Sequence, residues 1–194
     1  MLKRHQHGGR SSEAFFDVAD VLTSIGLKNG DVFLDAGCGP GHFAIAACGI
    51  VGPDGRVCAV DVHEESIDKL NEKAANRNLE NIDVSVADVT ERIPAADQTV
   101  DVCLMAKVFH GFEKQDAQNA LDEMLRVLKP GGLLAIVEFK KINGPPGPPL
   151  SIRLSPNEVE QAVRPRAFKR EKVFELGQYH YCLMMVKHDD QKGV

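Results

Sequence analysis

Three aspartates and one glycine-rich loop are the residues whose types and spacing could do chemistry. Asp35 opens the stretch DAGCGPG, in which Gly37, Gly39 and Gly41 stand at alternate positions. Glycine serves where the backbone needs a positive φ or must approach something closely. The stretch therefore predicts a ligand pressed against backbone amides and bare Cα atoms, although a tight strand-to-helix turn without a ligand is the simpler alternative. It does not match the dinucleotide pattern G-x-G-x-x-G, because its third glycine comes one residue early.

Two further aspartates end apolar stretches of the strand type. Asp61 ends RVCAVD, about 20 residues after the loop, the spacing at which a carboxylate accepts hydrogen bonds from ribose hydroxyls. It could also cap the helix predicted for HEESIDKL, and the two roles are compatible. Asp88 closes IDVSVAD, where its carboxylate could accept a hydrogen bond from an exocyclic amine such as that of adenine, or could simply be a turn aspartate.

The elements that must position these side chains alternate along the chain. Apolar runs typical of buried strands alternate with stretches that have helical spacing. We expect the first helix, which precedes the first strand, to begin at Ser11 or Ser12 and to stop at Gly26. The expected strands are DVFLDA, RVCAVDV, IDVSVAD, TVDVCLMA and, after a KPGG turn, LLAIVEF. This alternation predicts a doubly wound α/β fold, a parallel sheet with helices on both faces. Ligands bind such sheets at the carboxyl ends of the strands, where the three aspartates lie.

The rhythm changes after Phe139. The stretch from Asn143 to Leu150 holds four prolines and two glycines, which predicts a loop, and we place a proline-rich loop over residues 140–154. SPNEVEQAV predicts a helix capped by Ser155 with Glu158 completing a capping box. The end of the chain reads as two consecutive strands joined at LGQ, which predicts a C-terminal antiparallel hairpin.

Composition narrows the class of function. The chain has 194 residues, which suits one domain over 1–194, preceded by a flexible arm over 1–10. A net charge of −5 argues against a nucleic-acid substrate. We expect no membrane span, no secretory signal and hence a cytoplasmic protein. The five cysteines are widely spaced and contain no C-x-x-C pair, so we expect neither a disulfide framework nor a metal site.

Four motifs together resemble the class I S-adenosylmethionine-dependent methyltransferases, and in particular the small-molecule branch similar to ubiquinone/menaquinone-type enzymes. These motifs are VFLDAGCGPGHFA, VCAVDV, VADVTERIP and LKPGGLLAIVEF. The resemblance implies a Rossmann-like, mostly parallel sheet of seven strands whose last two form a reversed hairpin. It also implies S-adenosylmethionine as cofactor, S-adenosylhomocysteine as product and a small-molecule acceptor.

The resemblance also assigns roles to residues. Asp35 and the loop with Gly37, Cys38, Gly39 and Gly41 would hold the methionine end of the cofactor. The remaining contacts would come from the ends of the next three strands: Asp61 on the ribose, Val62 against the adenine, Asp88 and the Val89 backbone at the adenine amine, and Ala106 beside the methionine.

Catalysis would then need an aligned acceptor and a base. The stretch AKVFHGFEK follows the fourth strand, and in it His110 is the first candidate base and Lys107 the second, although either could be a packing or rim residue. We expect the acceptor pocket to be walled by residues 107–112, with Phe109 and Phe112 as apolar wall, by the loop 143–150 and by the N-terminal arm. Two alternatives stay open: a nicotinamide-dependent oxidoreductase, and a catalytically silent module that binds the cofactor.

Overall fold

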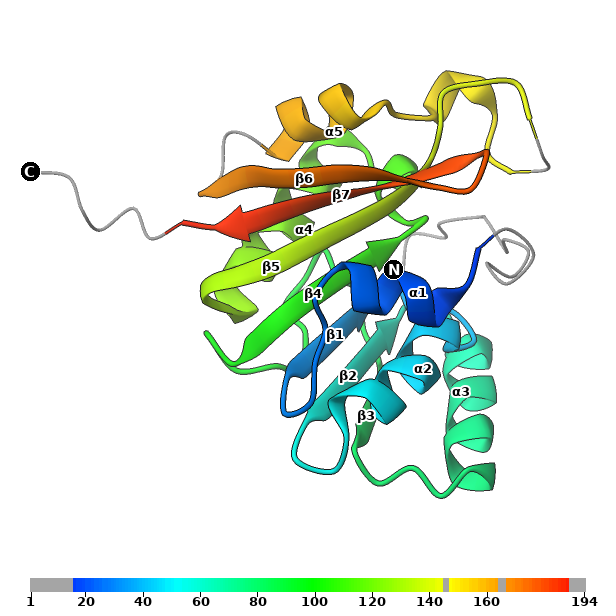
Figure 1. The fold of residues 1–194 in the computed structure, drawn as a ribbon, viewed down its shortest axis with the longest axis vertical. Coiled ribbons are helices and arrows are strands. Elements are labelled where there is room, and N and C mark those ends of the chain that lie inside the picture. The colour runs from blue at the N-terminus through cyan, green and yellow to red at the C-terminus, as the bar shows by residue number, and fades with distance from the viewer. Residues whose placement is uncertain (1–15, 145–146, 164–166, 189–194) are drawn as a thin grey trace, which may run out of the picture.

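The computed structural model describes residues 16–144, 147–163 and 167–188. Its centre is a seven-stranded sheet with the order β3-β2-β1-β4-β5-β7-β6, seen from β6 at the top to β3 at the bottom in Figure 1. The strands are β1 (Val32–Ala36), β2 (Arg56–Asp61), β3 (Ile82–Val86), β4 (Val100–Ala106), β5 (Leu128–Phe139), β6 (Phe168–Leu176) and β7 (His180–Lys187). The predicted doubly wound α/β fold is confirmed.

Strands β1 to β5 pair in parallel, and β7 pairs antiparallel with both β5 and β6. The C-terminal hairpin is therefore confirmed as well. Because the chain order reverses between β1 and β4, their carboxyl ends form the switch point at which such sheets bind ligands. Asp35 lies opposite Leu104 there, and the ends of β2 and β3 lie beside it, since the N–H of Ala87 donates to the carbonyl of Asp61 at 3.0 Å.

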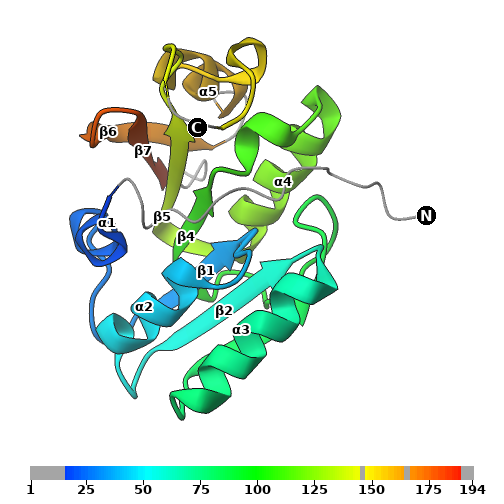
Figure 2. The same cartoon turned by 90° about the vertical axis from the view of Figure 1, so that its right-hand side faces the viewer.

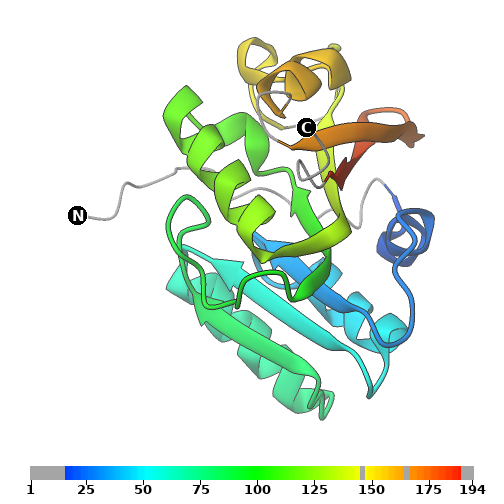
Figure 3. The same ribbon diagram turned by 90° about the vertical axis from the view of Figure 1, so that its left-hand side faces the viewer.

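Helices cover the sheet on both faces. Figure 2 shows α1, α2 and α3 on one face and α4 and α5 on the other, and Figure 3 shows the second face from the opposite side. The helices are α1 (Val18–Ser24), α2 (His42–Val51), α3 (Glu64–Asn76), α4 (Lys114–Val127) and α5 (Pro156–Val163), with short 3-10 turns at η2 (Phe109–Gly111) and η3 (Leu150–Ile152). None of the helices in these described ranges is long and apolar enough to span a membrane.

The core consists of two apolar layers, one on each face of the sheet. Neighbouring strand residues alternate between them: Phe33 packs with α1, α2 and α3, whereas Leu34 packs with α4 and α5. This alternation is the two-residue period of a strand that is buried on both faces. The layers hold the sheet rigid, and functional side chains gather where the strands end.

The first helix begins later than the sequence predicts. Its N-cap is Asp17, whose carboxylate accepts from the N–H groups of Ala19 and Asp20, so the described helix starts at Val18 and not at Ser11 or Ser12. The predicted stop at Gly26 is confirmed, since this glycine has a φ of 83°. The predicted arm over 1–10 lies outside the described residues.

The KPGG sequence does not form a separate turn between α4 and β5. Strand β5 already begins at Leu128, and its pairing with β4 jumps from Leu128 opposite Val100 to Leu133 opposite Val102. The four residues between them bulge out, and the Lys129 ammonium bonds both carboxylate oxygens of Asp101 at 2.7 and 2.8 Å. The extra residues are accommodated as a bulge at the amino-terminal end of the strand, away from the switch point.

Candidate cofactor-binding and catalytic site

The glycine loop 37–41 uses every one of its N–H groups inside the protein. Its first two amides donate to the Val60 carbonyl, at 2.8 and 3.0 Å. The amide of Gly39 donates to Oδ2 of Asp61 at 2.8 Å, and that of Gly41 to the carbonyl of the loop's second residue at 3.0 Å. Position 40 is a proline and has no N–H. Neighbouring acceptors therefore already bind all of these amides in this structure, and contact between the loop backbone and a ligand stays a prediction.

The three glycines of the loop differ in what surrounds them. All three have positive φ values, of 81°, 50° and 82°. A Cβ on Gly37 would lie 2.5 Å from Cγ2 of Val108, and one on Gly41 would lie 2.2 Å from Cδ1 of Leu70. A Cβ on Gly39 would meet no atom of the described residues within 4 Å, apart from its two chain neighbours. Two glycines are thus required by packing, whereas Gly39 presents a bare Cα to open space.

Asp35 is a buried carboxylate with an unused oxygen. It is 1% exposed, and no described residue lies within hydrogen-bonding distance of its Oδ2. Burial raises the pKa of its carboxyl from 3.8 to about 7, a hydrogen bond from the backbone of Ala44 lowers it, and the charge of Asp61 raises it further. A buried polar atom without a partner is costly, so this oxygen is well placed to receive a donor or a cation from a ligand.

Asp61 links the end of β2 to the glycine loop. Its Oδ2 accepts from Gly39 and its Oδ1 accepts from the N–H of His63 at 2.9 Å, beside the start of α3. The alternative that Asp61 caps α3 is wrong, because the N-cap is His63 and no described side chain accepts from the first-turn N–H groups. Each carboxylate oxygen has two acceptor positions, so each oxygen keeps one for a further donor such as a ribose hydroxyl.

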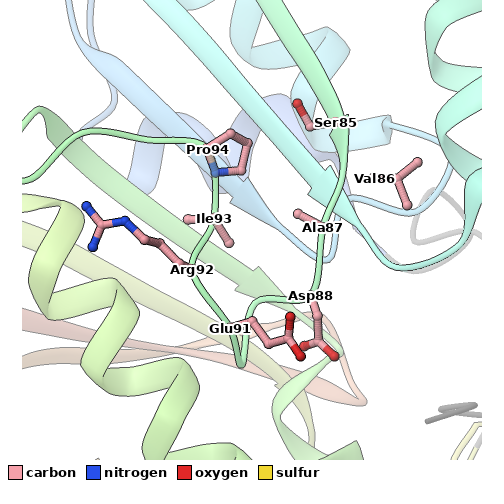
Figure 4. A pocket seen from close by; sticks show the side chains of 8 residues that line it. All are labelled: Ser85, Val86, Ala87, Asp88, Glu91, Arg92, Ile93 and Pro94. Atoms are coloured by element: carbon pink, nitrogen blue, oxygen red, sulfur yellow. The ribbon is translucent and has the colours of Figure 1, made fainter. Parts of the chain in front are cut away.

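Asp88 lies at the turn that follows β3. Its Oδ1 accepts both from the N–H and from the hydroxyl of Thr90, at 2.8 and 2.7 Å, which leaves Oδ2 to face outward. Figure 4 shows the turn, with Asp88 and Glu91 at its tip and Arg92 pointing away. The turn borders an open hollow lined by Ser85, Val86, Ala87, Asp88, Glu91, Arg92, Ile93 and Pro94.

The segment that follows β4 carries both predicted base candidates. Lys107 has a φ of 62°, unusual for a residue with a side chain, and its N–H donates to the carbonyl of Val137 at 2.7 Å. Burial lowers the pKa of its ammonium, and the nearby carboxylate of Glu138 opposes that shift. Such outliers gather at functional sites.

His110 lies against Glu138, a residue that the sequence analysis missed. The imidazole Nδ1 is 2.7 Å from Oε2 of Glu138, and the backbone N–H of His110 donates to Oε1 at 3.1 Å. The side chains are only 6% and 1% exposed. An acidic residue near the end of the otherwise apolar stretch LLAIVEF was the available signal, because a buried carboxylate in a strand needs a specific partner.

Aromatic and basic side chains surround this pair. The centroid of the Phe139 ring lies 6.2 Å from that of the His110 ring and 4.4 Å from that of the His180 ring. The guanidinium carbon of Arg153 lies over the Phe139 ring, 5.2 Å from its centroid. Burial lowers the pKa of His180 to about 4, and the charges of Lys107, Arg153 and Lys140 add to the shift. The region beyond β4 and β5 is thus electropositive, in contrast to the acidic edge of β1, β2 and β3.

Comparison with known proteins identifies the family. Residues 33–132 match the model of a methyltransferase domain. A solved S-adenosylmethionine-dependent methyltransferase from Aquifex aeolicus is 33% identical, with a TM-score of 0.85 over 92% of this chain and 94% of that one. This chain belongs to the S-adenosylmethionine-dependent methyltransferase family. A methyltransferase structure from Sulfolobus solfataricus, 24% identical with a TM-score of 0.75, shares the fold.

Two curated relatives of this methyltransferase match over part of their length. An arsenite methyltransferase from Halobacterium salinarum is 36% identical over 110 residues, which cover 57% of this chain and 27% of that protein. A demethylmenaquinone methyltransferase from Lactobacillus johnsonii is 33% identical over 120 residues, 61% of this chain and 48% of that protein. The chain thus spans less than half the length of these relatives.

The residues of this methyltransferase fit the family's cofactor. S-adenosylmethionine carries a sulfonium and an ammonium but no phosphate. The unused oxygen of Asp35, the carboxylates of Asp61 and Asp88, and the open Cα face of Gly39 suit a cation with a ribose and an adenine. The absence of an available N–H group between residues 37 and 41 removes the donors that a phosphate would need.

The other residues predicted to bind the cofactor lie at the same edge. Cys38 is a buried residue of the loop, Val62 directly follows β2, and Ala106 is the last residue of β4; the side chains of Val62 and Ala106 are partly exposed. The side chain of Val89 is 5% exposed in the core, so only its backbone is available at the rim. Phe109 is also in the core, at 2% exposure, and the prediction that it lines a pocket is wrong.

Proposed function

We propose that this domain transfers a methyl group from S-adenosylmethionine to a small-molecule acceptor. The observation that carries the proposal is the acidic edge formed by Asp35, Asp61 and Asp88 around a glycine loop with no available amide. When bound, the cofactor supplies an activated methyl carbon, and the electron pair of the broken bond remains on its sulfur.

The chain's own residues would hold the cofactor, orient the acceptor and take a proton from it. Asp35 would receive the cationic methionine end, and the remaining acceptor positions of Asp61 would receive the ribose hydroxyls. Asp88, with the Val89 backbone, would receive the adenine amine. His110 or Lys107, after β4, would take a proton from the acceptor.

The relatives differ in the acceptor that their names give, and the cysteines favour one class. A trivalent arsenic acceptor is soft and calls for accessible thiolates. Four of the five cysteines are buried, and burial is the main cause of a raised pKa at each of the five thiols. These residues support an organic acceptor instead. The net charge of −5 supports a small molecule over a nucleic acid.

A nicotinamide-dependent oxidoreductase is the alternative that the loop argues against. Dinucleotide sites direct unused N–H groups of the loop and helix start at the pyrophosphate. Here the loop amides bind Val60, Asp61 and the loop itself, and the backbone of Ala44 at the start of α2 bonds Asp35. A dianionic pyrophosphate would meet a buried carboxylate there.

Calorimetry with S-adenosylmethionine, S-adenosylhomocysteine and NAD tests the cofactor. A screen with radiolabelled methyl donor over small phenols, hydroquinones, thiols and amines then tests turnover. Binding of the first two ligands without NAD, followed by labelling of one organic acceptor, is the expected result. Tight, strongly salt-dependent binding of RNA or DNA would contradict the small-molecule assignment.

A further inference from the structure

Glu138 is the one buried charge of β5, and both of its oxygens contact a single residue. Its Oε1 accepts the backbone N–H of His110 and its Oε2 lies 2.7 Å from the imidazole Nδ1. Glu138 is 0% exposed. A carboxylate buried at this depth needs strong hydrogen bonds, and it obtains them by fixing both the backbone and the ring of His110.

This contact sets the state of the imidazole. When a carboxylate accepts from Nδ1–H, the neutral ring carries its lone pair on Nε2, and the same carboxylate stabilises the imidazolium once Nε2 takes a proton. Gln at position 138 could supply only one acceptor oxygen. It would therefore lose either the bond to the backbone N–H or the bond to the ring.

The pair belongs to the edge at which the cofactor would bind. Strand β4 is the neighbour of β1, with Leu104 opposite Asp35. Two residues before His110, the side chain of Val108 occupies the space beside the Cα of Gly37. The candidate base His110, in the 3-10 turn η2, therefore follows closely along the chain after a side chain that contacts the glycine loop.

We propose that Glu138 is a positioning residue that makes His110 the general base, and that the acceptor is a small molecule with an acidic hydroxyl of the phenol class. The inference rests on the proposed methyl transfer. A phenol, with a pKa of about 10, keeps its proton at neutral pH and needs a base, whereas a thiol, at about 8.5, ionises more readily by itself. The positive charges of Lys107, Arg153 and Lys140 act on His180, which lies against Phe139 next to His110, and they favour the resulting phenolate.

The proton balance is simple. An oxygen lone pair of the acceptor would form the new bond to the methyl carbon while the bond from that carbon to the cofactor's sulfur breaks, which leaves its electron pair on sulfur and gives S-adenosylhomocysteine. The hydroxyl proton would pass to Nε2 of His110. The imidazolium, held by the Glu138 carboxylate, then releases that proton to solvent. No oxidant, reductant or metal is required.

The first test needs no acceptor. Nitrogen-15 NMR of the histidine rings, with His110→Gln to identify the resonance, reports which ring nitrogen carries the proton. We expect His110 to be protonated on Nδ1 in the wild type and to lose this preference in Glu138→Leu, which offers no acceptor. Protonation on Nε2 in the wild type, or an unchanged state in Glu138→Leu, overturns the proposal.

The second test is turnover with catechol and hydroquinone as probes. His110→Gln and Glu138→Gln should each lower kcat by about 10²–10⁴-fold and remove or displace the acidic limb of the pH–rate profile. Their affinity for S-adenosylmethionine should be unchanged. The matched control is Glu175→Gln, an exposed carboxylate paired with Lys140, which should behave as the wild type.

The outcomes separate this proposal from the function on which it rests. Loss of stability in Glu138→Gln with kcat and pH profile retained assigns Glu138 a structural role only and overturns the inference. Methylation of thiols in preference to both phenols overturns the acceptor class. Absence of S-adenosylmethionine binding in the wild type overturns the proposed function itself, whatever the state of His110.

Discussion

The side chain of Val108 fills the space that a Cβ on Gly37 would need, with Cγ2 2.5 Å from that position. This contact joins the glycine loop after β1 to the segment after β4. The predicted cofactor side and the predicted base side of the site therefore depend on one packed interface. Gly37 maintains that interface, Gly41 packs against Leu70 of α3, and Gly39 faces open space.

Alanine substitutions should separate these two roles. Gly37→Ala must displace Val108 and should destabilise the fold by about 2–4 kcal/mol through overpacking and the positive φ. In Gly39→Ala the new methyl group meets no described residue other than its chain neighbours within 4 Å, so the substitution should cost only about 1–2 kcal/mol. Its methyl group would occupy the open face, however, and should weaken S-adenosylmethionine binding at least tenfold. Urea unfolding and calorimetry measure both effects, and full affinity in Gly39→Ala would remove this face from the site.

Asp35 should make the ligand-free protein less stable as pH rises. Its pKa is raised from 3.8 to about 7 by burial, so between these values the folded state holds a proton that the unfolded state has lost. Stability therefore falls from about pH 4 to pH 7, by an amount on the order of 4 kcal/mol. Asp35→Asn should lack this fall, which unfolding at pH 5 and pH 8 tests. Parallel pH curves for the two proteins would contradict it.

His180 should act in the opposite direction. Its pKa is lowered to about 4, so the unfolded state gains a proton below the ordinary value of 6.5 while the folded state does not. Stability is thus complete above about pH 6.5 and is lost as pH falls toward 4. As pH falls over this interval, the free energy of unfolding of His180→Phe should decrease by about 1–3 kcal/mol less than that of the wild type.

Arg153 should hold the segment between β5 and α5 in place. Its guanidinium donates to the carbonyls of Pro148 and Ile142, at 3.0 and 2.8 Å, and lies over Phe139. Arg153→Met keeps the packed stem and removes these bonds, so amide exchange in residues 147–152 should accelerate tenfold or more. Lys141→Met, which removes only a half-exposed ion pair with Glu158, should leave that exchange unchanged.

The fold was predictable because local signals agree with the global arrangement. The apolar runs that contain Asp35 and Asp61 near their ends are strands. The predicted helix cap at Ser155 is confirmed, because Oε2 of Glu158 accepts from the N–H of Ser155 at 2.8 Å and from the Ser155 hydroxyl at 2.7 Å. The start of α1 was mispredicted since Ser11, Ser12 and Asp17 are all good caps, and sequence alone does not rank them. The bulge at Lys129 depends on a partner strand, which no local pattern contains.

The placement of the candidate site residues at one edge of the sheet was predictable, but their contacts were not. Strand ends place Asp35, Asp61 and Asp88 at one edge, yet the internal use of the loop amides depends on Val60, which is close only in the folded chain. Glu138 was missed for the same reason. Its partner His110 lies 28 positions away along the chain, and only the β4–β5 pairing brings them together.

The most direct test of the account is calorimetric titration of S-adenosylmethionine into the wild type and Asp61→Ala, with NAD as the comparison ligand. We predict binding of S-adenosylmethionine to the wild type, no binding of NAD, and an affinity in Asp61→Ala lower by about 1–3 kcal/mol, or roughly 5- to 150-fold. Equal affinity of the two proteins for S-adenosylmethionine, or tighter binding of NAD, would contradict the assignment of this edge as the cofactor site.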